Sequence, residues 1–261
     1  MVGETWDGLL NDADGFHVRP EHVTAALADA RGGPVAEGNV GGGTGMVCHE
    51  FKGGIGTASR RVPDDHGGWV VGVLVQANYG RRGLLRIDGV PVGQEISSQE
   101  VPSPYEARRR GGGAGATDAR DPRPGPARER DGSIIVIVAT NAPVLPFQCR
   151  RLAQRASLGL ARAGGLSSTT SGDLMLCFSN GNRGLPPPEV EPSGPGVATV
   201  RMLVDRALDP LFEAVVEATE ESIANALVAA ETMIGRDGLT AHRLPHDHLR
   251  EVMARYGRLR G

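Results

Sequence analysis

At the pair Gly132-Ser133, a residue with a nucleophilic hydroxyl group stands at the first position of an expected strand. The run SIIVIVAT begins at Ser133 and predicts a buried strand, directly behind a long segment that is poor in apolar residues. If the chain is cut between the two residues, Ser133 becomes an N-terminal serine. Its own α-amine, with an ordinary pKa of about 7.7–8.0, can then take the proton from its hydroxyl. Many strands begin with Gly-Ser and are never cleaved, so the residues alone leave both interpretations open.

The cut itself can be autocatalytic. The hydroxyl of Ser133 attacks the carbonyl of Gly132, an ester forms, and water releases it. Glycine at position 132 has no Cβ and tolerates a strained approach, and an open tether before the junction lets the new chain end withdraw. The sequence contains no G-x-S-x-G motif, so a serine nucleophile of the α/β-hydrolase kind is not supported.

Three other motifs could also carry chemistry. The glycine-rich residues 37–46 could bind an anion through backbone N–H groups, but they fit neither common nucleotide-binding pattern, which favours a loop where backbone packs on backbone. His246 and His248 lie two residues apart and not on one helix face, so we expect a helix start and no metal site. Cys48 and His49 could form a thiol nucleophile, although a buried cysteine beside a polar neighbour is the commoner case.

Composition sets the broad class of the protein. Of its 261 residues 39% are hydrophobic and only 4% aromatic, so the core must be built from Val, Leu, Ile and Ala. The formal net charge of -3 gives no reason to expect nucleic acid or an anionic membrane as a partner. No run approaches the ~20 apolar residues of a membrane span, and no secretory signal follows Met1. Three cysteines without CxxC spacing favour free thiols, so we expect a cytoplasmic protein with no metal or other cofactor.

Periodicity and turn signals divide the chain into expected elements. The predicted helices cover residues 19–31, 146–163, 205–234 and 248–256, and the predicted strands cover 69–77, 84–93, 133–140 and 173–179. A glycine-rich loop is expected over 38–60 and a flexible linker over 97–132. The strand at 133–140 should be buried on both faces. Buried strands with amphipathic helices predict an α/β fold in which helices cover a sheet.

Longer motifs carry a resemblance to a known family. They are GETWDGLLND, EGNVGGGTGM, FKGGIGTASR, VGVLVQANYG, DGSIIVIVATNAPV, TSGD and LPHDHLREVMARYGR. Together they resemble the self-cleaving aminopeptidases of the DmpA / β-aminopeptidase type, the P1 family peptidases of class S58. The resemblance covers nearly the whole chain apart from the linker. It implies a single domain over residues 1–261, folded as an αββα sandwich like that of N-terminal-nucleophile hydrolases but with different connectivity.

The resemblance also implies an activity. The precursor would cut itself between Gly132 and Ser133 into an α chain, residues 1–132, and a β chain, residues 133–261. Ser133 would then remove N-terminal L-, D- or β-amino acid residues from small amides, esters and peptides. The αβ units would assemble into a homo-oligomer.

The same resemblance assigns the supporting residues. Ser171 would hydrogen-bond the nucleophile, and Asp173 would hold either the free ammonium group of the substrate or the amine of Ser133. Asn78 would donate its side-chain amide to the developing oxyanion, an effect worth about 2.7–4 kcal/mol. Trp6 stands where the family has an active-site tyrosine. Read without the resemblance, Ser171, Asp173 and Asn78 are ordinary turn residues before or after strands.

Two departures from the family pattern sustain an alternative. Trp6 stands in place of the family's tyrosine, and members have a substantial region before the GET motif, at which this chain starts. We therefore also consider a truncated, catalytically inactive homologue that acts as a binding scaffold. Position 173, which is Asp where members often carry Glu, differs in reach and bears on substrate size. A third hypothesis is an anion or nucleotide binder that uses residues 41–45.

Overall fold

The structure is a computed structural model that describes residues 3–110, 132–169, 171–185 and 196–259. Its helices are α1 Pro20–Ala28, α2 Val92–Glu95, α3 Pro104–Arg110, α4 Pro146–Arg162, α5 Asp209–Val228 and α6 His246–Arg255. Its strands are β1 Val47–Cys48, β2 Phe51–Lys52, β3 Gly54–Arg61, β4 Val70–Asn78, β5 Ser133–Thr140, β6 Leu174–Ser179, β7 Met233–Ile234 and β8 Thr240–Ala241.

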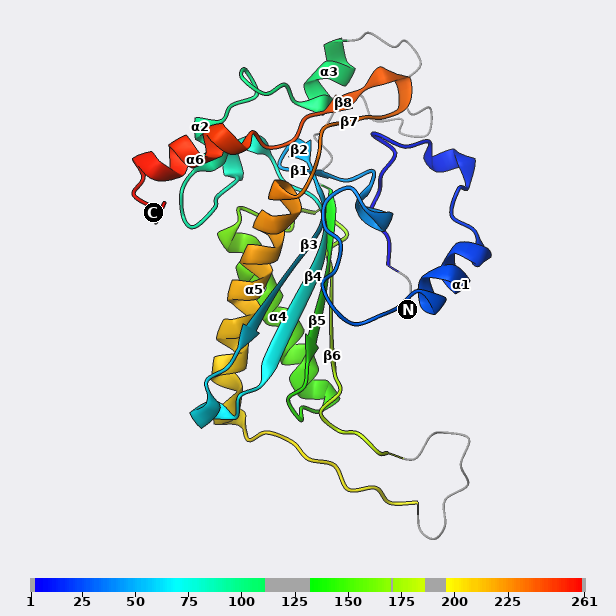
Figure 1. Cartoon of the computed structure of the whole chain (residues 1–261), viewed down its shortest axis with the longest axis vertical. Helices are drawn as coiled ribbons and strands as arrows, with labels where there is room; N and C mark the ends of the chain where they lie inside the picture. Colours follow the sequence, from blue (N-terminus) through cyan, green and yellow to red (C-terminus); the bar gives the residue numbers. More distant parts are fainter. Residues whose placement is uncertain (1–2, 111–131, 170, 186–195, 260–261) are drawn as a thin grey trace.

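A four-stranded sheet in the order β3-β4-β5-β6 forms the centre of the fold (Figure 1). The pairs β3–β4 and β4–β5 are antiparallel, whereas β5 and β6 run parallel. A parallel pair needs a crossover, and α4 supplies it between β5 and β6. The register pairs Ser133 with Asn78, so the first residue of β5 lies beside the last residue of β4.

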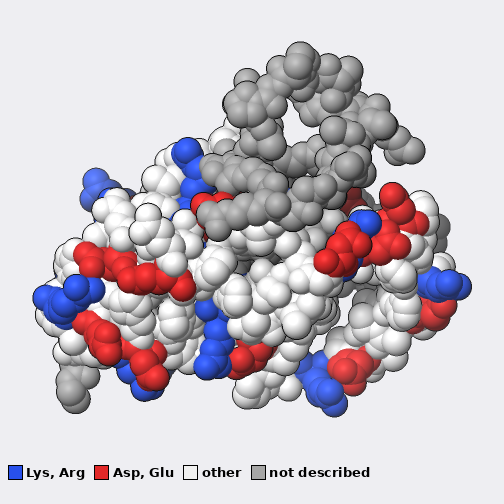
Figure 2. Space-filling view, turned by 90° about the horizontal axis from the view of Figure 1, so that it is seen from above, with Lys and Arg blue, Asp and Glu red and all other residues white. Residues whose placement is uncertain are grey.

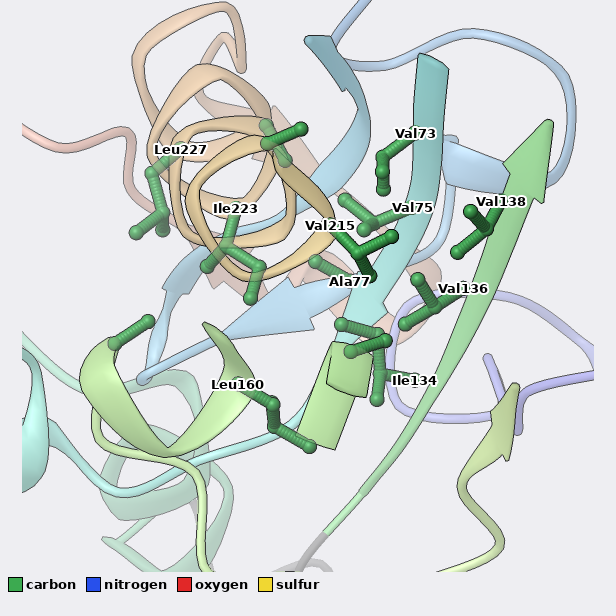
Figure 3. Packing of buried hydrophobic residues seen from close by; sticks show 14 of the residues in the cluster. Val73, Val75, Ala77, Ile134, Val136, Val138, Leu160, Val215, Ile223 and Leu227 are labelled. Atoms are coloured by element: carbon green, nitrogen blue, oxygen red, sulfur yellow. The ribbon is translucent and has the colours of Figure 1, made fainter. Parts of the chain in front are cut away.

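One face of this sheet, called here the covered face, packs under α4 and α5 (Figures 1 and 3). Alternate residues of β4 and β5 point into that layer because side chains along a strand alternate between faces. Their partners on the helices are apolar and fully buried. The labelled members of this core are Val73, Val75, Ala77, Ile134, Val136, Val138, Leu160, Val215, Ile223 and Leu227. Burial of each larger side chain contributes roughly 1.5–3 kcal/mol, which fixes the two strands that carry Ser133 and Asn78.

The opposite face, called here the open face, has less cover from the described residues. Leu74, Ile137 and Leu176 face one another across three strands and are only partly buried, and Phe178 is 51% exposed. The N-terminal segment reaches this face only near Ser133, where a Cβ on Gly3 would lie 3.3 Å from Cδ1 of Ile135. The prediction that residues 133–140 are buried on both faces is therefore wrong for the second half of the strand.

Most predicted elements are confirmed. The helices expected at 19–31, 146–163 and 248–256 are α1, α4 and α6, and the strands expected at 69–77, 133–140 and 173–179 are β4, β5 and β6. The α/β class, with helices covering a sheet, is confirmed as well. His246 begins α6, as expected for a helix start.

The expected loop over residues 38–60 is wrong because it contains β3, the strand at one edge of the sheet. Glycines lower the strand propensity of this stretch, but packing reverses the balance. A Cβ on Gly56 would overlap the carbonyl oxygen of Ser222 and lie 2.5 Å from the amide nitrogen of Ala226. Glycine therefore lets α5 lie directly on the strand. Within the same run, residues 41–43 form a 3-10 turn in which backbone packs on backbone, as predicted.

The strand expected over residues 84–93 is also wrong. Asp88 and Gly89 adopt φ values of 49° and 76°, and Ile87 pairs with Val90 across the tight turn that they form. The chain then enters α2 at Val92. The apolar residues of this stretch are buried by a turn and a short helix instead of by a ladder of strands.

Two further boundaries differ from the prediction. The long helix ends at Val228, not at residue 234. Beyond this end, the side-chain amide of Asn39 donates to the carbonyl oxygen of Glu231 and accepts from its backbone N–H. Residues 233–234 instead pair with β8. The expected linker over residues 97–132 contains α3, and Ser103 before it is fully buried. Residues 111–131 of that prediction lie outside the described residues.

Seen from above, the described surface carries acidic and basic side chains interspersed around an uncharged area (Figure 2). Among the described helices, none combines the length and apolarity that a bilayer-crossing helix requires.

Candidate active site

The junction Gly132-Ser133 lies at the edge of the sheet where β4 ends and β5 begins. Ser133 is partly buried and pairs with Asn78. Position 132 has room for glycine alone, because a Cβ there would overlap the backbone carbonyl oxygen of Asn78. The close approach of two backbones holds the peptide bond before Ser133 in one place.

Three consecutive residues before β6 face this junction. The backbone N–H of Gly172 donates to Oγ of Ser133 at 2.9 Å. The Oγ of Ser171 lies 2.8 Å from the carbonyl oxygen of Gly132 and 2.6 Å from Oδ1 of Asp173. Because β6 runs parallel to β5, the segment that enters β6 must lie beside the start of β5. The parallel pairing therefore brings the predicted Ser171 and Asp173 to the predicted nucleophile.

The hydroxyl of Ser171 has one proton to give and two acceptors within reach. It can donate to the carbonyl oxygen of the Gly132-Ser133 peptide bond or to the carboxylate of Asp173. Asp173 also accepts from the backbone N–H of Ile134 at 3.1 Å, which ties it to β5. The arrangement places a donor on the carbonyl under attack and an anionic group one bond further away.

Asn78 is buried, and its side-chain amide is held at both ends. Its Nδ2 donates to the carbonyl oxygen of Trp6 at 2.8 Å, and its Oδ1 accepts from the backbone N–H of Val47 at 2.9 Å. An amide nitrogen carries two hydrogens, so one remains for another acceptor. The same Nδ2 lies 3.3 Å from the position that a Cβ on Gly132 would take, so Asn78 lies beside the junction. The indole of Trp6 is 44% exposed.

A buried lysine supports the loop that holds Asn78. The Nζ of Lys52 donates to the carbonyl oxygens of Gly43, Met46 and Gly53 at 3.1, 2.9 and 2.7 Å. Burial lowers the pKa of Lys52 to about 8. These three bonds join the glycine-rich turn to β2, and the turn leads directly to Val47, the residue that fixes the amide of Asn78. The glycine-rich motif thus has a positioning role close to the junction.

Cys48 and His49 do not form an activated thiol. Both are fully buried, and burial raises the pKa of Cys48 to about 12, so the thiol stays protonated. His49 Nδ1 lies 3.0 Å from the carbonyl oxygen of Arg81, and burial lowers the pKa of its ring to about 4. A thiolate is needed for nucleophilic attack, so this pair is structural.

A pocket opens beside the junction on the Gly132 side. Its lining comes from the end of β4, from Gly132 and from the loop that runs from α4 to β6. The lining includes four residues with polar side chains, Tyr79, Ser168, Ser171 and Asp173. Sequence reasoning missed Tyr79, Ser168 and Gly172. Two of them are chain neighbours of predicted site residues, which is the one signal that pointed to them.

Comparison with known proteins identifies the family of this chain. The model of the family described as peptidase family S58 matches residues 1–241. The chain belongs to peptidase family S58. The chain is 48% identical over 259 residues to the β-peptidyl aminopeptidase BapA of Sphingosinicella microcystinivorans and 42% identical over 261 residues to that of Sphingosinicella xenopeptidilytica. It covers 99% of its own length in both matches but 62% and 60% of these relatives.

Solved structures of S58-like enzymes give the fold. A Burkholderia sp. β-aminopeptidase matches with a TM-score of 0.83 at 48% identity, over 99% of this chain and 64% of that one. The L-aminopeptidase D-Ala-esterase/amidase of Ochrobactrum anthropi matches with a TM-score of 0.77 at 39% identity, over 98% of this chain and 62% of that one. The latter is described as a prototype for the serine aminopeptidases and a new variant of the Ntn-hydrolase fold. The S58 chain described here has this α/β fold, and the predicted family is confirmed.

Proposed function

We propose that this S58 chain is a serine aminopeptidase that activates itself by cutting the bond between Gly132 and Ser133. The observation that carries the proposal is the set of contacts at that bond: Ser171 Oγ on the Gly132 carbonyl and Gly172 N–H on Ser133 Oγ. The Ser133 hydroxyl accepts a hydrogen bond from Gly172, and the Gly132 carbonyl has the Ser171 hydroxyl within hydrogen-bonding distance.

The first reaction is an acyl shift followed by hydrolysis. Ser133 Oγ forms a bond to the carbonyl carbon of Gly132, the C–N bond breaks, and the hydroxyl proton passes to the nitrogen of Ser133. Ser171 donates to the carbonyl oxygen as it becomes negative, which is the arrangement that stabilises an oxyanion. Water then hydrolyses the ester to give the carboxylate of Gly132 and a free N-terminal Ser133.

The second reaction repeats this chemistry on a substrate. The free amine of Ser133 takes the proton of its own hydroxyl, and Oγ attacks the carbonyl of the substrate's N-terminal residue. The leaving amine receives a proton, and water releases the acyl group. In this proposal Ser171 and the second N–H of Asn78 stabilise the oxyanion, and the carboxylate of Asp173 attracts a substrate ammonium group; the contacts of these side chains at the junction support the assignment.

Substrate class and assembly follow the relatives. Two of these relatives are named β-peptidyl aminopeptidases, and another is named an L-aminopeptidase and D-Ala-esterase/amidase. We infer small peptides, amides or esters with a free N-terminal residue, including β-amino residues, and a homo-oligomer of αβ units. The cytoplasmic location remains a prediction of the sequence.

Turnover of β-alanyl p-nitroanilide by the purified chain tests the proposal. We expect Ser133→Ala to leave the chain uncut and to lower turnover at least 10³-fold, and Ser171→Ala to slow both reactions by about 10²–10³-fold, the cost of one oxyanion donor. The matched control is Ser157→Ala on the exposed side of α4, which should behave as the parent. Equal turnover by the parent and by Ser133→Ala would exclude the proposed nucleophile.

A scaffold without catalysis is the second candidate, and the open face favours it. A sheet face with Leu176 partly exposed and Phe178 half exposed is suited to binding another polypeptide. A chain that stays uncut, hydrolyses neither amides nor esters, and still folds cooperatively would support this candidate.

A further inference from the structure

Two residues that line the pocket at the Gly132 end carry buried hydroxyl groups without a hydrogen-bond partner among the described residues. These groups are the phenolic hydroxyl of Tyr79 and Oγ of Ser168. Tyr79 as a whole is only 6% exposed. An unpaired buried hydroxyl costs about 1–3 kcal/mol, and folded proteins retain few of them. Two such groups on residues that line one pocket beside Gly132 are open to pairing with a ligand that enters this pocket.

The position of Gly132 indicates that the acyl side of a substrate would enter this pocket. During self-cleavage Gly132 is the acyl donor, and its carbonyl lies against Ser171. In the aminopeptidase reaction the carbonyl of the substrate's N-terminal residue must take the same place, because the same Oγ attacks it. Gly132 itself lines the pocket, so the atoms on the acyl side of that carbonyl point into it. In an aminopeptidase substrate these atoms carry the free amine.

The charges and donors of the pocket fit an ammonium group. Its described lining contains one carboxylate, that of Asp173, and one cation, Arg81, whose side chain is exposed to water. Burial, with smaller contributions from Cys48 and Asp173, raises the pKa of Tyr79 well above its ordinary value. The phenol therefore stays neutral and offers a lone pair to an N–H donor. Tyr79, Ser168 and Asp173 line the same pocket, and each carries an oxygen atom that can accept a hydrogen bond from an ammonium group.

We propose that Tyr79 and Ser168 bind the ammonium group of the substrate's N-terminal residue alongside Asp173, so that this pocket is the subsite for that residue. The inference rests on the proposed function and adds the residues that select a free amine. Its consequence is a preference for substrates with an ammonium group over otherwise identical substrates that lack one.

A pair of p-nitrophenyl esters tests this preference, because the β-alanyl and propionyl esters differ only in the amine and both are reactive enough to measure. Tyr79→Phe removes one oxygen atom and should lower the ratio of kcat/KM values, β-alanyl over propionyl, about 10-fold, with KM for the β-alanyl ester carrying most of the change. Ser168→Ala should lower the same ratio about 3-fold. The matched control is Tyr256→Phe, which removes an exposed hydroxyl that bonds Glu95 away from the pocket and should keep the parental ratio.

Stability separates binding from a structural role. Loss of an unpaired buried hydroxyl should leave Tm unchanged or raise it, so a lower ratio in Tyr79→Phe cannot arise from misfolding. If the parent is cut at Ser133 and hydrolyses both esters, but Tyr79→Phe and Ser168→Ala keep its ratio, the inference is wrong and the proposed function stands. A parent that stays uncut and hydrolyses neither ester contradicts both. If Tyr79→Phe is not processed, the ratio of Ser168→Ala decides.

Discussion

Ile134 and Ile137 lie three residues apart on β5 and meet very different surroundings. Ile134 has no exposed surface and points under α4 and α5, whereas Ile137 points to the open face and is only partly buried. The covered face of the sheet is thus a fully buried apolar core, and the open face is apolar but only partly covered by the described residues. The difference shows that the core under α4 and α5 buries more of β4 and β5, the strands that carry the junction at Gly132-Ser133, than the open face does.

The open face is the side on which Ser133 and Asn78 present their side chains. Asn78 bonds the N-terminal segment at Trp6 there, and Gly3 approaches Ile135. The chain spans about three fifths of the length of the curated relatives it matches. The covered face therefore accounts for the rigidity of the site, and the open face is where substrate and additional polypeptide would approach.

The largest expected effect separates the two isoleucines. Ile134→Ala should lower the free energy of unfolding by about 4 kcal/mol, because it removes a fully buried side chain from a packed core. Ile137→Ala should cost about 1 kcal/mol, since its side chain is already partly in water. Urea unfolding measures both. Equal losses would show that the open face is covered in the folded protein.

Two glycine substitutions compare the same two faces of the sheet, because Gly56 faces α5 and Gly72 faces open space. Gly56→Ala on β3 should cost about 3 kcal/mol, because the new Cβ would overlap the backbone of α5 at Ser222. Gly72→Ala on β4 meets no atom within 4 Å and should be neutral or stabilise by up to about 1 kcal/mol. If Gly56→Ala is as stable as the parent, the close contact between β3 and α5 is not present in solution.

A smaller loss in the free energy of unfolding is expected at low pH, where His49 takes up a proton. Burial lowers the pKa of His49 from 6.5 to about 4, so its neutral form is favoured in the folded chain and its charged form in the unfolded chain. Stability from this residue is fully present above pH 6.5 and is lost as the pH falls toward 4, by about 2 kcal/mol between pH 7 and pH 5.

The test for His49 is urea unfolding across this pH range in the parent, in His49→Gln and in the exposed control His66→Gln. His49→Gln should flatten the dependence and His66→Gln should retain it. A parental slope in His49→Gln would assign the acid sensitivity to other groups.

The sequence predicted the parts of this fold that local pattern determines. The run at residues 133–140 and the apolar stripe at 146–163 have unambiguous periods, and β5 and α4 lie there. It did not predict β3, because the glycine that lets α5 approach looks like a loop residue until the helix is placed against it. The stretch at 84–93 has the apolar content of a strand, but its turn at Asp88-Gly89 leaves no neighbouring strand to pair with.

Some residues of the candidate site could likewise be predicted from the sequence, and others could not. Ser133, Ser171, Asp173 and Asn78 were predicted from motifs, and the sheet brings all of them to one edge. Their roles stay predictions. The backbone N–H of Gly172 and the hydroxyls of Tyr79 and Ser168 could not be predicted, because a backbone donor has no residue signature and an unpaired hydroxyl is visible only once its surroundings are known.

The intact mass of the purified protein tests the central claim most directly. We expect two species from one gene product, one of which begins with Ser133, and a single chain of 27.4 kDa when Ser133 is replaced by Ala. An uncut parental chain that nevertheless hydrolyses β-alanyl p-nitroanilide would contradict the account, because the serine amine that it uses as a base would still be locked in a peptide bond.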